Sequence, residues 1–384
     1  MASAVKGVEP TGLGELSSGA RAGDALKVGI IGAGQLGRMV ALAGYPLGLR
    51  FEMLDPNPHA CGGQVAPLAV APFDDREALA ALARRVDVVS FEFENVPVGA
   101  MEFVESLVPV YPRPPVLETA QDRLREKECF LGLGIPVPGY RVVNSLVELE
   151  SAVADLGLPA VLKTRRLGYD GKGQSLLRRP EDLPAAWELL GGSLLILEEF
   201  VPFDREVSLV AVRGLNGSMA FYPLAENTHR EGILHLSLAR PADPCQGMAE
   251  EYVKRVLTHF SYVGVMAFEF FQVGDGLLAN EIAPRVHNSG HWTIEGAETS
   301  QFDNHLRAIL GWPLGSTSLV GQAAMVNFIG ELPPAPSLLG RAGLHFHNYG
   351  KSSAPGRKLG HATLRVPESV DLEEALAEIN WESV

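Results

Sequence analysis

The sequence is poor in cysteine and contains no long apolar run. Its three cysteines, Cys61, Cys129 and Cys245, lie far apart and form no CxxC pair, so neither a disulfide framework nor a zinc site is indicated. No stretch of about 18 apolar residues could span a membrane, and the N-terminus lacks the apolar segment of a secretory signal. We therefore expect a cytoplasmic protein that binds no membrane.

Basic side chains are also in deficit. The 384 residues include 32 Lys and Arg against 46 Asp and Glu, which gives a net charge of −14. This balance disfavours nucleic acids and anionic lipids as partners, so any anionic ligand must be bound by a local basic cluster. The length and the hydrophobic content of 46% are sufficient for two or three domains or subdomains.

The central pattern is a predicted β-hairpin with a carboxylate in each strand. An aromatic run that ends at Val273 and an apolar run that begins at Leu277 flank the turn-forming residues 274–276. If these three residues form the loop, Val273 pairs with Leu277 and Glu269 lies opposite Glu281. A register error of one residue would instead put one glutamate on the solvent face, and the hairpin alone does not decide between the two.

Two facing carboxylates would need a cation. Opposed side chains in a hairpin lie only about 5 Å apart, and like charges there repel. Carboxylate oxygens suit Mg2+, which typically binds one or two protein carboxylates together with phosphate oxygens of a substrate. The polar residues that follow the hairpin, Arg285, His287 and Asn288, place hydrogen-bond donors beside the proposed metal. This combination favours an anionic substrate.

Near the N-terminus, a predicted strand over 27–31 leads into the glycine-rich segment 32–37 and a helical run over 38–47. The segment is a GxGxxG pattern between a strand and a helix, and Asp55 ends the next strand. One interpretation is a dinucleotide site, with pyrophosphate at the helix N-terminus and a ribose on Asp55. The alternative is a tight or phosphate-binding turn that never binds NAD.

Further candidate ligands occur along the middle of the chain. Glu92 and Glu94 follow a predicted third strand over 86–89, at the edge where open α/β sheets bind ligands. Lys163 closes an apolar strand and needs an anionic partner. The loop 168–174 is glycine-rich and cationic, so its backbone N–H groups could cradle phosphate. The plainer alternatives are solvated strand ends for the glutamates and a simple hairpin turn for the loop.

A basic cluster lies near the C-terminus of this acidic chain. Lys351, Arg357 and Lys358 fall within one short segment that also contains Pro355 and Gly356. A solvated basic loop is one explanation. Because strands are predicted on both sides and the turn formers fix the backbone, we favour a phosphomonoester site.

Together these motifs resemble the ATP-grasp superfamily and, within it, the N5-carboxyaminoimidazole ribonucleotide synthetase family of purine biosynthesis. The resemblance extends from Lys27 to about Thr363 and rests on the segments 34–37, 169–174, 280–293, 299–302 and 355–361. It implies an α/β and α+β fold, the ATP-grasp fold. The expected parts are a disordered leader (1–26), a Rossmann-like preATP-grasp domain (27–120), an ATP-grasp lid subdomain (121–200) and a C-terminal ATP-grasp domain with a terminal β subdomain (201–384).

The resemblance also implies roles for individual residues. ATP phosphates would be bound by Arg123, Lys127 and Lys163 together with the lid loop Gly168, Tyr169, Asp170, Gly171, Lys172, Gly173 and Gln174. Adenine and ribose would be bound by Glu198, Glu199, Phe200, Val201, Glu206 and His229. Glu269 and Glu281, beside Asn280, would bind Mg2+ or Mn2+.

The remaining implied residues bind bicarbonate and the acceptor. The catalytic set for bicarbonate and carboxyphosphate would be Lys172, Arg285, His287, Asn288 and Lys351. 5-Aminoimidazole ribonucleotide would contact Gln35, Leu36 and Glu92, with its 5′-phosphate on Lys351, Arg357 and Lys358. Family members often have Arg where this chain has Ala354, so one phosphate contact is expected to be missing.

The implied reaction is an ATP-dependent carboxylation. Bicarbonate attacks the γ-phosphate, carboxyphosphate forms and releases CO2, and the exocyclic amine of the ribonucleotide captures it. The implied partners are ATP, bicarbonate and the ribonucleotide, a second copy of the chain in a homodimer, and the mutase that takes the product. The alternatives are a ligase similar to formate-dependent glycinamide ribonucleotide transformylase, an NAD-dependent oxidoreductase, and a nucleotide sensor without turnover.

Overall fold

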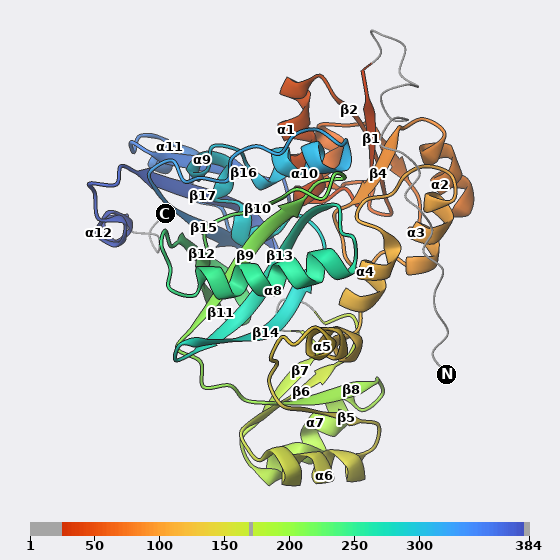
Figure 1. The fold of residues 1–384 in the computed structure, drawn as a ribbon, viewed down its shortest axis with the longest axis vertical. Helices are drawn as coiled ribbons and strands as arrows, with labels where there is room; N and C mark the ends of the chain where they lie inside the picture. Colours follow the sequence, from red (N-terminus) through yellow and green to blue (C-terminus); the bar gives the residue numbers. More distant parts are fainter. Residues whose placement is uncertain (1–24, 169–171, 380–384) are drawn as a thin grey trace.

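The structure, a computed structural model, describes residues 25–168 and 172–379. Its strands form a parallel sheet near the N-terminus, a small antiparallel sheet and a nine-stranded sheet (Figure 1). The ranges 27–120, 121–200 and 201–384 each contain one of these sheets. Within the described residues, no helix combines the length and the apolar character needed to cross a membrane.

The first sheet is parallel, with the strand order β3-β2-β1-β4 of a Rossmann-like half. Its strands are β1 (Lys27–Ile31), β2 (Arg50–Asp55), β3 (Leu68–Val70) and β4 (Val88–Phe91). Helices of this part are α1 (Gln35–Gly44), α2 (Arg76–Ala83), α3 (Val98–Glu105) and α4 (Pro114–Ala120). The sequence predicted β1 and β2, but it missed β3, began the third strand two residues early at Val86, and began α1 three residues late at Arg38.

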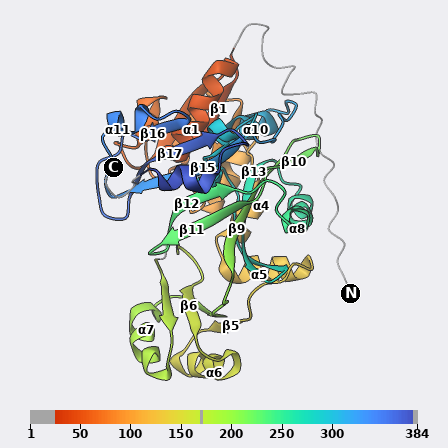
Figure 2. The same ribbon diagram turned by 90° about the vertical axis from the view of Figure 1, so that its left-hand side faces the viewer.

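The small sheet is antiparallel, in the order β5-β8-β6-β7. It consists of β5 (Tyr140–Val143), β6 (Ala160–Thr164), β7 (Gln174–Leu177) and β8 (Leu195–Glu199), with α6 (Leu146–Leu156) and α7 (Leu183–Leu190). These two helices and the sheet share their own apolar core. In both Figure 1 and Figure 2 this unit projects from the rest of the molecule, below α5 (Arg123–Gly132).

The nine-stranded sheet runs β14-β13-β9-β11-β12-β15-β17-β16, with β10 paired to β9. Its strands are β9 (Arg205–Arg213), β10 (Met219–Phe221), β11 (Ala225–Arg230), β12 (Ile233–Ala239), β13 (Gly264–Val273), β14 (Gly276–Ala283), β15 (Gln322–Ile329), β16 (Leu344–Asn348) and β17 (Lys358–Val366). The associated helices are α8 (Gln246–His259), α9 (Thr293–Gly296), α10 (Gln301–Ile309), α11 (Ala335–Leu339) and α12 (Leu372–Ala377).

Two cores cover the two faces of this sheet. On one face α8 packs through Val253 and Leu257 against apolar residues of β9, β13 and β14. On the other face α10 packs between the sheet and α1, and its Phe302 and Leu306 join the core of the N-terminal part. The β13–β14 hairpin is therefore held between the parallel sheet above and α5 and the small sheet below (Figure 1).

A buried histidine links the parallel sheet to the large one. The backbone N–H of Val265 on β13 donates to Nδ1 of His305 (3.1 Å), and Nε2 lies 2.9 Å from the hydroxyl of Ser90 on β4. Because Nδ1 accepts, Nε2 carries the proton and donates to Ser90. His305 on α10 thus joins three elements through one neutral ring.

This link makes stability depend on pH. Burial lowers the pKa of His305 from its usual 6.5 to about 4, so the unfolded chain binds a proton below pH 6.5 that the folded chain takes up only near pH 4. The contribution of His305 to stability therefore falls by about 3 kcal/mol as the pH decreases from 6.5 to 4.

We expect the free energy of unfolding in urea, measured from pH 7 to 4.5, to decrease less steeply in H305Q than in the wild type. The exposed His59 provides the matched control, because H59Q should keep the wild-type slope. Equal slopes for wild type and H305Q would contradict the assignment.

Candidate active site

The two glutamates of the hairpin face each other. Glu269 on β13 pairs directly with Glu281 on β14. The interpretation that put one of them on the solvent face is therefore wrong. The predicted loop is wrong as well, because Val273 pairs with Gly276 across the two-residue turn Gly274–Asp275.

A β-bulge reconciles the shorter loop with the facing pair. Phe270 pairs with Ala279 and Glu269 with Glu281, so Asn280 is the extra residue on β14. Leu277 and Ala279 are buried before the bulge, and Ile282 is buried after it. The bulge keeps these apolar side chains on the core face and moves Glu281 off it. Without it, Glu281 would point to the same face as Leu277 and Ala279.

The pair carries the electrostatic signature of two close carboxylates. Burial and then the charge of Glu281 raise the pKa of Glu269 to about 7. Arg123 Nη1 lies 2.9 Å from Glu281 Oε2, and His287 Nε2 lies 3.4 Å from Glu269 Oε1. Burial and the charge of Arg285 lower the pKa of His287 well below its usual value, so His287 is neutral and adds no positive charge beside Glu269.

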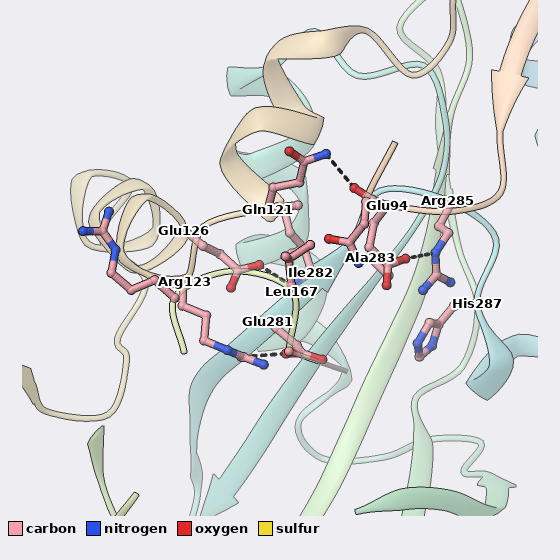
Figure 3. A pocket seen from close by; sticks show the side chains of 14 residues that line it. Glu94, Gln121, Arg123, Glu126, Leu167, Glu281, Ile282, Ala283, Arg285 and His287 are labelled. Carbon is pink, nitrogen blue, oxygen red and sulfur yellow. Dashed lines mark hydrogen bonds and ion pairs between the residues drawn. The ribbon is translucent and has the colours of Figure 1, made fainter. Parts of the chain in front are cut away.

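Figure 3 shows the pocket beside this pair. It opens between α5, the β4–α3 segment and the end of β14, and its lining is Glu94, Asn95, Ala120, Gln121, Arg123, Glu126, Arg165, Leu167, Gly168, Glu281, Ile282, Ala283, Arg285 and His287. Arg123, Gly168, Glu281, Arg285 and His287 were expected from the sequence.

Glu126 and Gln121 also line the pocket and were missed, whereas Glu94 was a candidate ligand in the sequence. Glu126 is buried one helical turn from Arg123, and its carboxylate accepts the backbone N–H of Ile282 (2.8 Å), which fixes β14 next to Glu281. Gln121 Nε2 donates to the backbone carbonyl of Glu94 in the β4–α3 segment (2.8 Å). Only the position of Glu94 after a predicted strand gave a signal in the sequence.

Arg285 and Asn288 lie beside the pair on the segment after β14. Arg285 forms an ion pair with Glu94, and its Nη1 donates to the carbonyl of Val286 (3.0 Å). Asn288, in the 3-10 turn η4 (Asn288–Gly290), is 7% exposed, and both polar atoms of its side chain have no protein partner among the described residues. A buried amide of this kind is available for a ligand.

The two lysines expected at the ATP phosphates are joined to a buried glutamate. Lys127 Nζ on α5 lies 3.2 Å from Glu198 Oε1, and Lys163 Nζ on β6 lies 2.9 Å from Glu198 Oε2. Burial alone would raise the pKa of Glu198, but Lys163, Lys127 and Arg123 lower it to about 2. Glu198 was expected to contact adenine. In this structure its carboxylate forms ion pairs with Lys127 and Lys163.

The other expected adenine and ribose residues follow Glu198 along the chain. Glu199 and Phe200 are exposed and Val201 is buried, where the chain leaves the small sheet for β9. Glu206 on β9 forms an ion pair with His229 on β11. Burial lowers the pKa of His229, but Glu206 and Glu269 outweigh that effect and raise it. These two residues therefore lie on the large sheet, on the side of Glu269.

The glycine-rich loop is tied to α5 at its base. Asp122, the N-cap of α5, accepts two hydrogen bonds from Arg165 (3.0 and 2.7 Å). At the far end of the loop, the backbone N–H of Thr164 on β6 donates to the carbonyl of Gly173 (2.8 Å). Lys172 precedes Gly173, and Gln174 begins β7. Tyr169, Asp170 and Gly171 lie outside the described residues.

The GxGxxG turn is closed by the chain's own carboxylates. Glu92 accepts the N–H groups of Gly34 (2.7 Å) and Gly37 (3.0 Å), and Asp55 accepts the N–H of Ala33 (2.8 Å). A Cβ atom at Gly34 would lie 2.7 Å from Glu92 Oε1, so the glycine permits this approach. A dinucleotide pyrophosphate would have to displace Glu92 from the helix N-terminus, which counts against the NAD interpretation.

The expected acceptor residues gather beside this turn. Lys351 Nζ contacts Gln35 Oε1 and lies 3.5 Å from the carbonyl of Lys358. Leu36 is buried in the core. Arg357 is exposed, and its Nη1 donates to the carbonyl (3.0 Å) and hydroxyl (2.9 Å) of Ser352. Gln35 and Lys351 thus share one region, although they are 316 residues apart in sequence.

The buried Glu198 triad gives a stability prediction. E198A leaves Lys127 and Lys163 close together and buried without a counter-charge, which should cost about 3–5 kcal/mol. Urea unfolding at pH 7 measures this loss, and the exposed neighbour gives the control, since E199A should change stability by no more than about 0.5 kcal/mol. Similar values for both variants would contradict a structural role of the triad.

Comparisons with known proteins cover nearly the whole described chain. Residues 25–121 match the ribonucleotide synthetase preATP-grasp domain, 128–302 the ATP-grasp domain, and 323–375 the phosphoribosylaminoimidazole carboxylase C-terminal domain. The N5-carboxyaminoimidazole ribonucleotide synthase of Pseudomonas aeruginosa is 56% identical over 354 residues, 92% of this chain and 98% of that protein.

Solved structures agree. The N5-carboxyaminoimidazole ribonucleotide synthetase of Thermus thermophilus is 58% identical with a TM-score of 0.87, covering 91% of this chain and 96% of that one. The Aspergillus clavatus enzyme, in complex with ADP and 5-aminoimidazole ribonucleotide, is 32% identical with a TM-score of 0.85, covering 93% and 97%. The expected fold class is confirmed, and the chain belongs to the N5-carboxyaminoimidazole ribonucleotide synthase family of ATP-grasp ligases.

Proposed function

We propose that the pocket beside the Glu269–Glu281 pair carries out the carboxylation of 5-aminoimidazole ribonucleotide with ATP and bicarbonate, through carboxyphosphate. The observation that carries this proposal is the grouping of a facing carboxylate pair, the cationic Arg285 and the polar Asn288 between an ATP-grasp lid and a second basic site. ATP is the co-substrate of this fold. The relative from Aspergillus clavatus binds ADP and the ribonucleotide together, which supports the acceptor.

The nucleotide would lie between the small sheet and the large one. Arg123 and the loop 168–174 are suited to the phosphates, because both border the pocket at Glu281. Lys127 on α5 and Lys163 on β6 add positive charge for the phosphates, and the carboxylate of Glu198 partly neutralises that charge. The segment 199–201 would hold adenine, and Glu206 with His229 would hold the ribose.

The donor set fits Mg2+. Glu269 and Glu281 face each other, and the raised pKa of Glu269, caused by burial and by Glu281, marks a place where a cation would stabilise the ionised pair. In the part of the chain that the structure describes, no third His, Cys, Asp or Glu joins them in a ligand cluster, so phosphate oxygens and water would complete the shell. The bound metal would neutralise charge on the phosphates during transfer.

The chain's own residues would position the reacting groups. Arg285 and Asn288, with Lys172 and Lys351, offer donors to bicarbonate, and neutral His287 borders the same place. A bicarbonate oxygen forms a bond to the γ-phosphorus as the bond to ADP breaks. Carboxyphosphate then separates into CO2 and phosphate, and the acceptor nitrogen bonds to CO2 and loses a proton. Closure of the small sheet over the site would exclude water, which would otherwise consume the intermediate.

The acceptor would occupy the region of the GxGxxG turn. Gln35, the backbone of Leu36 and Glu92 are suited to the nucleoside, and Lys351, Arg357 and Lys358 to its 5′-phosphate. Four further points stay predictions: the homodimer, delivery of the product to the mutase, the use of Mn2+ and the cytoplasmic location.

The first test is ADP release from Mg-ATP and bicarbonate, with and without 5-aminoimidazole ribonucleotide. We expect the ribonucleotide to stimulate release and to become carboxylated. Release that requires formate and glycinamide ribonucleotide instead would keep the ATP-grasp assignment and overturn the substrate. Tight binding of NADH without binding of ATP would favour the oxidoreductase instead.

E281Q should abolish Mg-ATP turnover, because one of the two metal carboxylates is lost. Its effect on folding should be small, since the Glu281 side chain is 42% exposed. Steady-state ADP release measures the loss of turnover, and thermal unfolding measures the effect on folding. Wild-type activity in E281Q would rule out Glu281 as a metal ligand.

R357A should raise the KM for the ribonucleotide by about 10-fold or more and leave the KM for ATP nearly unchanged, because a charge-assisted phosphate contact is worth roughly 1.5–3 kcal/mol. R341A, which removes an exposed arginine at the opposite end of the β16–β17 pair, is the control. An equal rise in both KM values would mean that Arg357 does not bind the acceptor's phosphate.

A further inference from the structure

The side chain of Arg285 is oriented by Glu94. Arg285 Nε donates to Glu94 Oε2, and Nη1 donates to the carbonyl of Val286 (3.0 Å). These interactions use two of the five N–H bonds of the guanidinium. Figure 3 shows the Nη end of Arg285 pointing toward His287, inside the pocket. Glu94 thus fixes the plane of the group and turns its remaining donors to the proposed bicarbonate position.

Glu94 belongs to a segment that is fixed at both ends. Two residues earlier, Glu92 accepts the N–H groups of Gly34 and Gly37 in the turn of the proposed acceptor site. On the other side, Gln121 Nε2 donates to the carbonyls of Glu94 (2.8 Å) and Val96 (2.7 Å). One short stretch of backbone, 92–96, therefore reaches from the acceptor site to the guanidinium of Arg285.

We propose that Glu94 is a positioning residue for Arg285 and that segment 92–96 couples the acceptor site to the site where carboxyphosphate forms. This inference rests on the proposed function. When Glu94 holds Arg285, carboxyphosphate and the CO2 it releases stay where the acceptor amine can reach them. When Arg285 turns away, water consumes the intermediate, and ATP is hydrolysed without carboxylation.

The role proposed for Glu94 depends on the position of its side-chain oxygen and not on its charge. Two substitutions separate these two effects. E94Q keeps a side-chain oxygen at the same distance from the backbone and loses the charge. In E94D the charge is kept, but the side chain is one methylene shorter and its oxygens no longer reach Arg285 in the same position. We expect E94Q to release about one ADP per carboxylated ribonucleotide, as the wild type does. E94D should lower kcat by about 10-fold or more with an unchanged KM for ATP, because displacement of about 1 Å costs up to 100-fold, and its ratio of ADP to product should rise severalfold.

A second variant acts on the segment without touching Arg285. Q121A removes both hydrogen bonds to the carbonyls at 94 and 96, and it should raise the ratio of ADP to product in the same direction as E94D. E105D, in the exposed Arg113–Glu105 ion pair of the same domain, is the matched control and should keep the wild-type ratio.

The measurement is the ratio of ADP to carboxylated ribonucleotide for all four variants and the wild type at saturating substrates. A wild-type ratio in both E94D and Q121A would overturn the inference. So would uncoupling in E94Q with normal coupling in E94D, because charge would then matter and geometry would not. A wild-type enzyme that never carboxylates the ribonucleotide would overturn the proposed function instead, which keeps the two failures apart.

Discussion

Repulsion between Glu269 and Glu281 is the constraint around which this molecule is arranged. Two carboxylates held opposite each other in an apolar hairpin are unfavourable unless positive charge or hydrogen-bond donors lie close by. The chain supplies them from separate elements. Arg123 on α5 contacts Glu281, His287 contacts Glu269, and the charge of Arg285 acts on Glu269 without a direct ion pair. A protein with a net charge of −14 can in this way present a site for anions. Every part of the fold that meets at the hairpin contributes to it.

How far the sequence predicts this site depends on the range of the interaction. The predicted pairing of Glu269 with Glu281 is correct because the assumed loop was one residue too long, which offset the extra residue of the bulge. The loop was wrong because apolar residues at 277, 279 and 282 are spaced by two and then three, a sign of a bulge that was not used. Short-range patterns of this kind are present in the sequence, since they reflect which face of a strand is buried.

Long-range pairs could not be predicted in the same way. Lys163 needed an anionic partner, but its identity as Glu198 follows from the pairing of β6 with β8. Glu94 and Arg285 lie 191 residues apart. Nothing local to either residue indicates the other. The glycine-rich turn shows the same limit: its strand–turn–helix geometry was predicted, yet the carboxylates that fill it come from Asp55 and Glu92.

The bulge at Asn280 has a consequence for how this hairpin tolerates changes in length. A strand without Asn280 would be regular, and the two glutamates would still face each other with Leu277 and Ala279 in the core. The hairpin can thus lose this one residue and keep its carboxylate pair, whereas an inserted residue would require a second bulge. During evolution, single-residue gaps at this point would be expected to alter the twist of the strand before they separate the two acids.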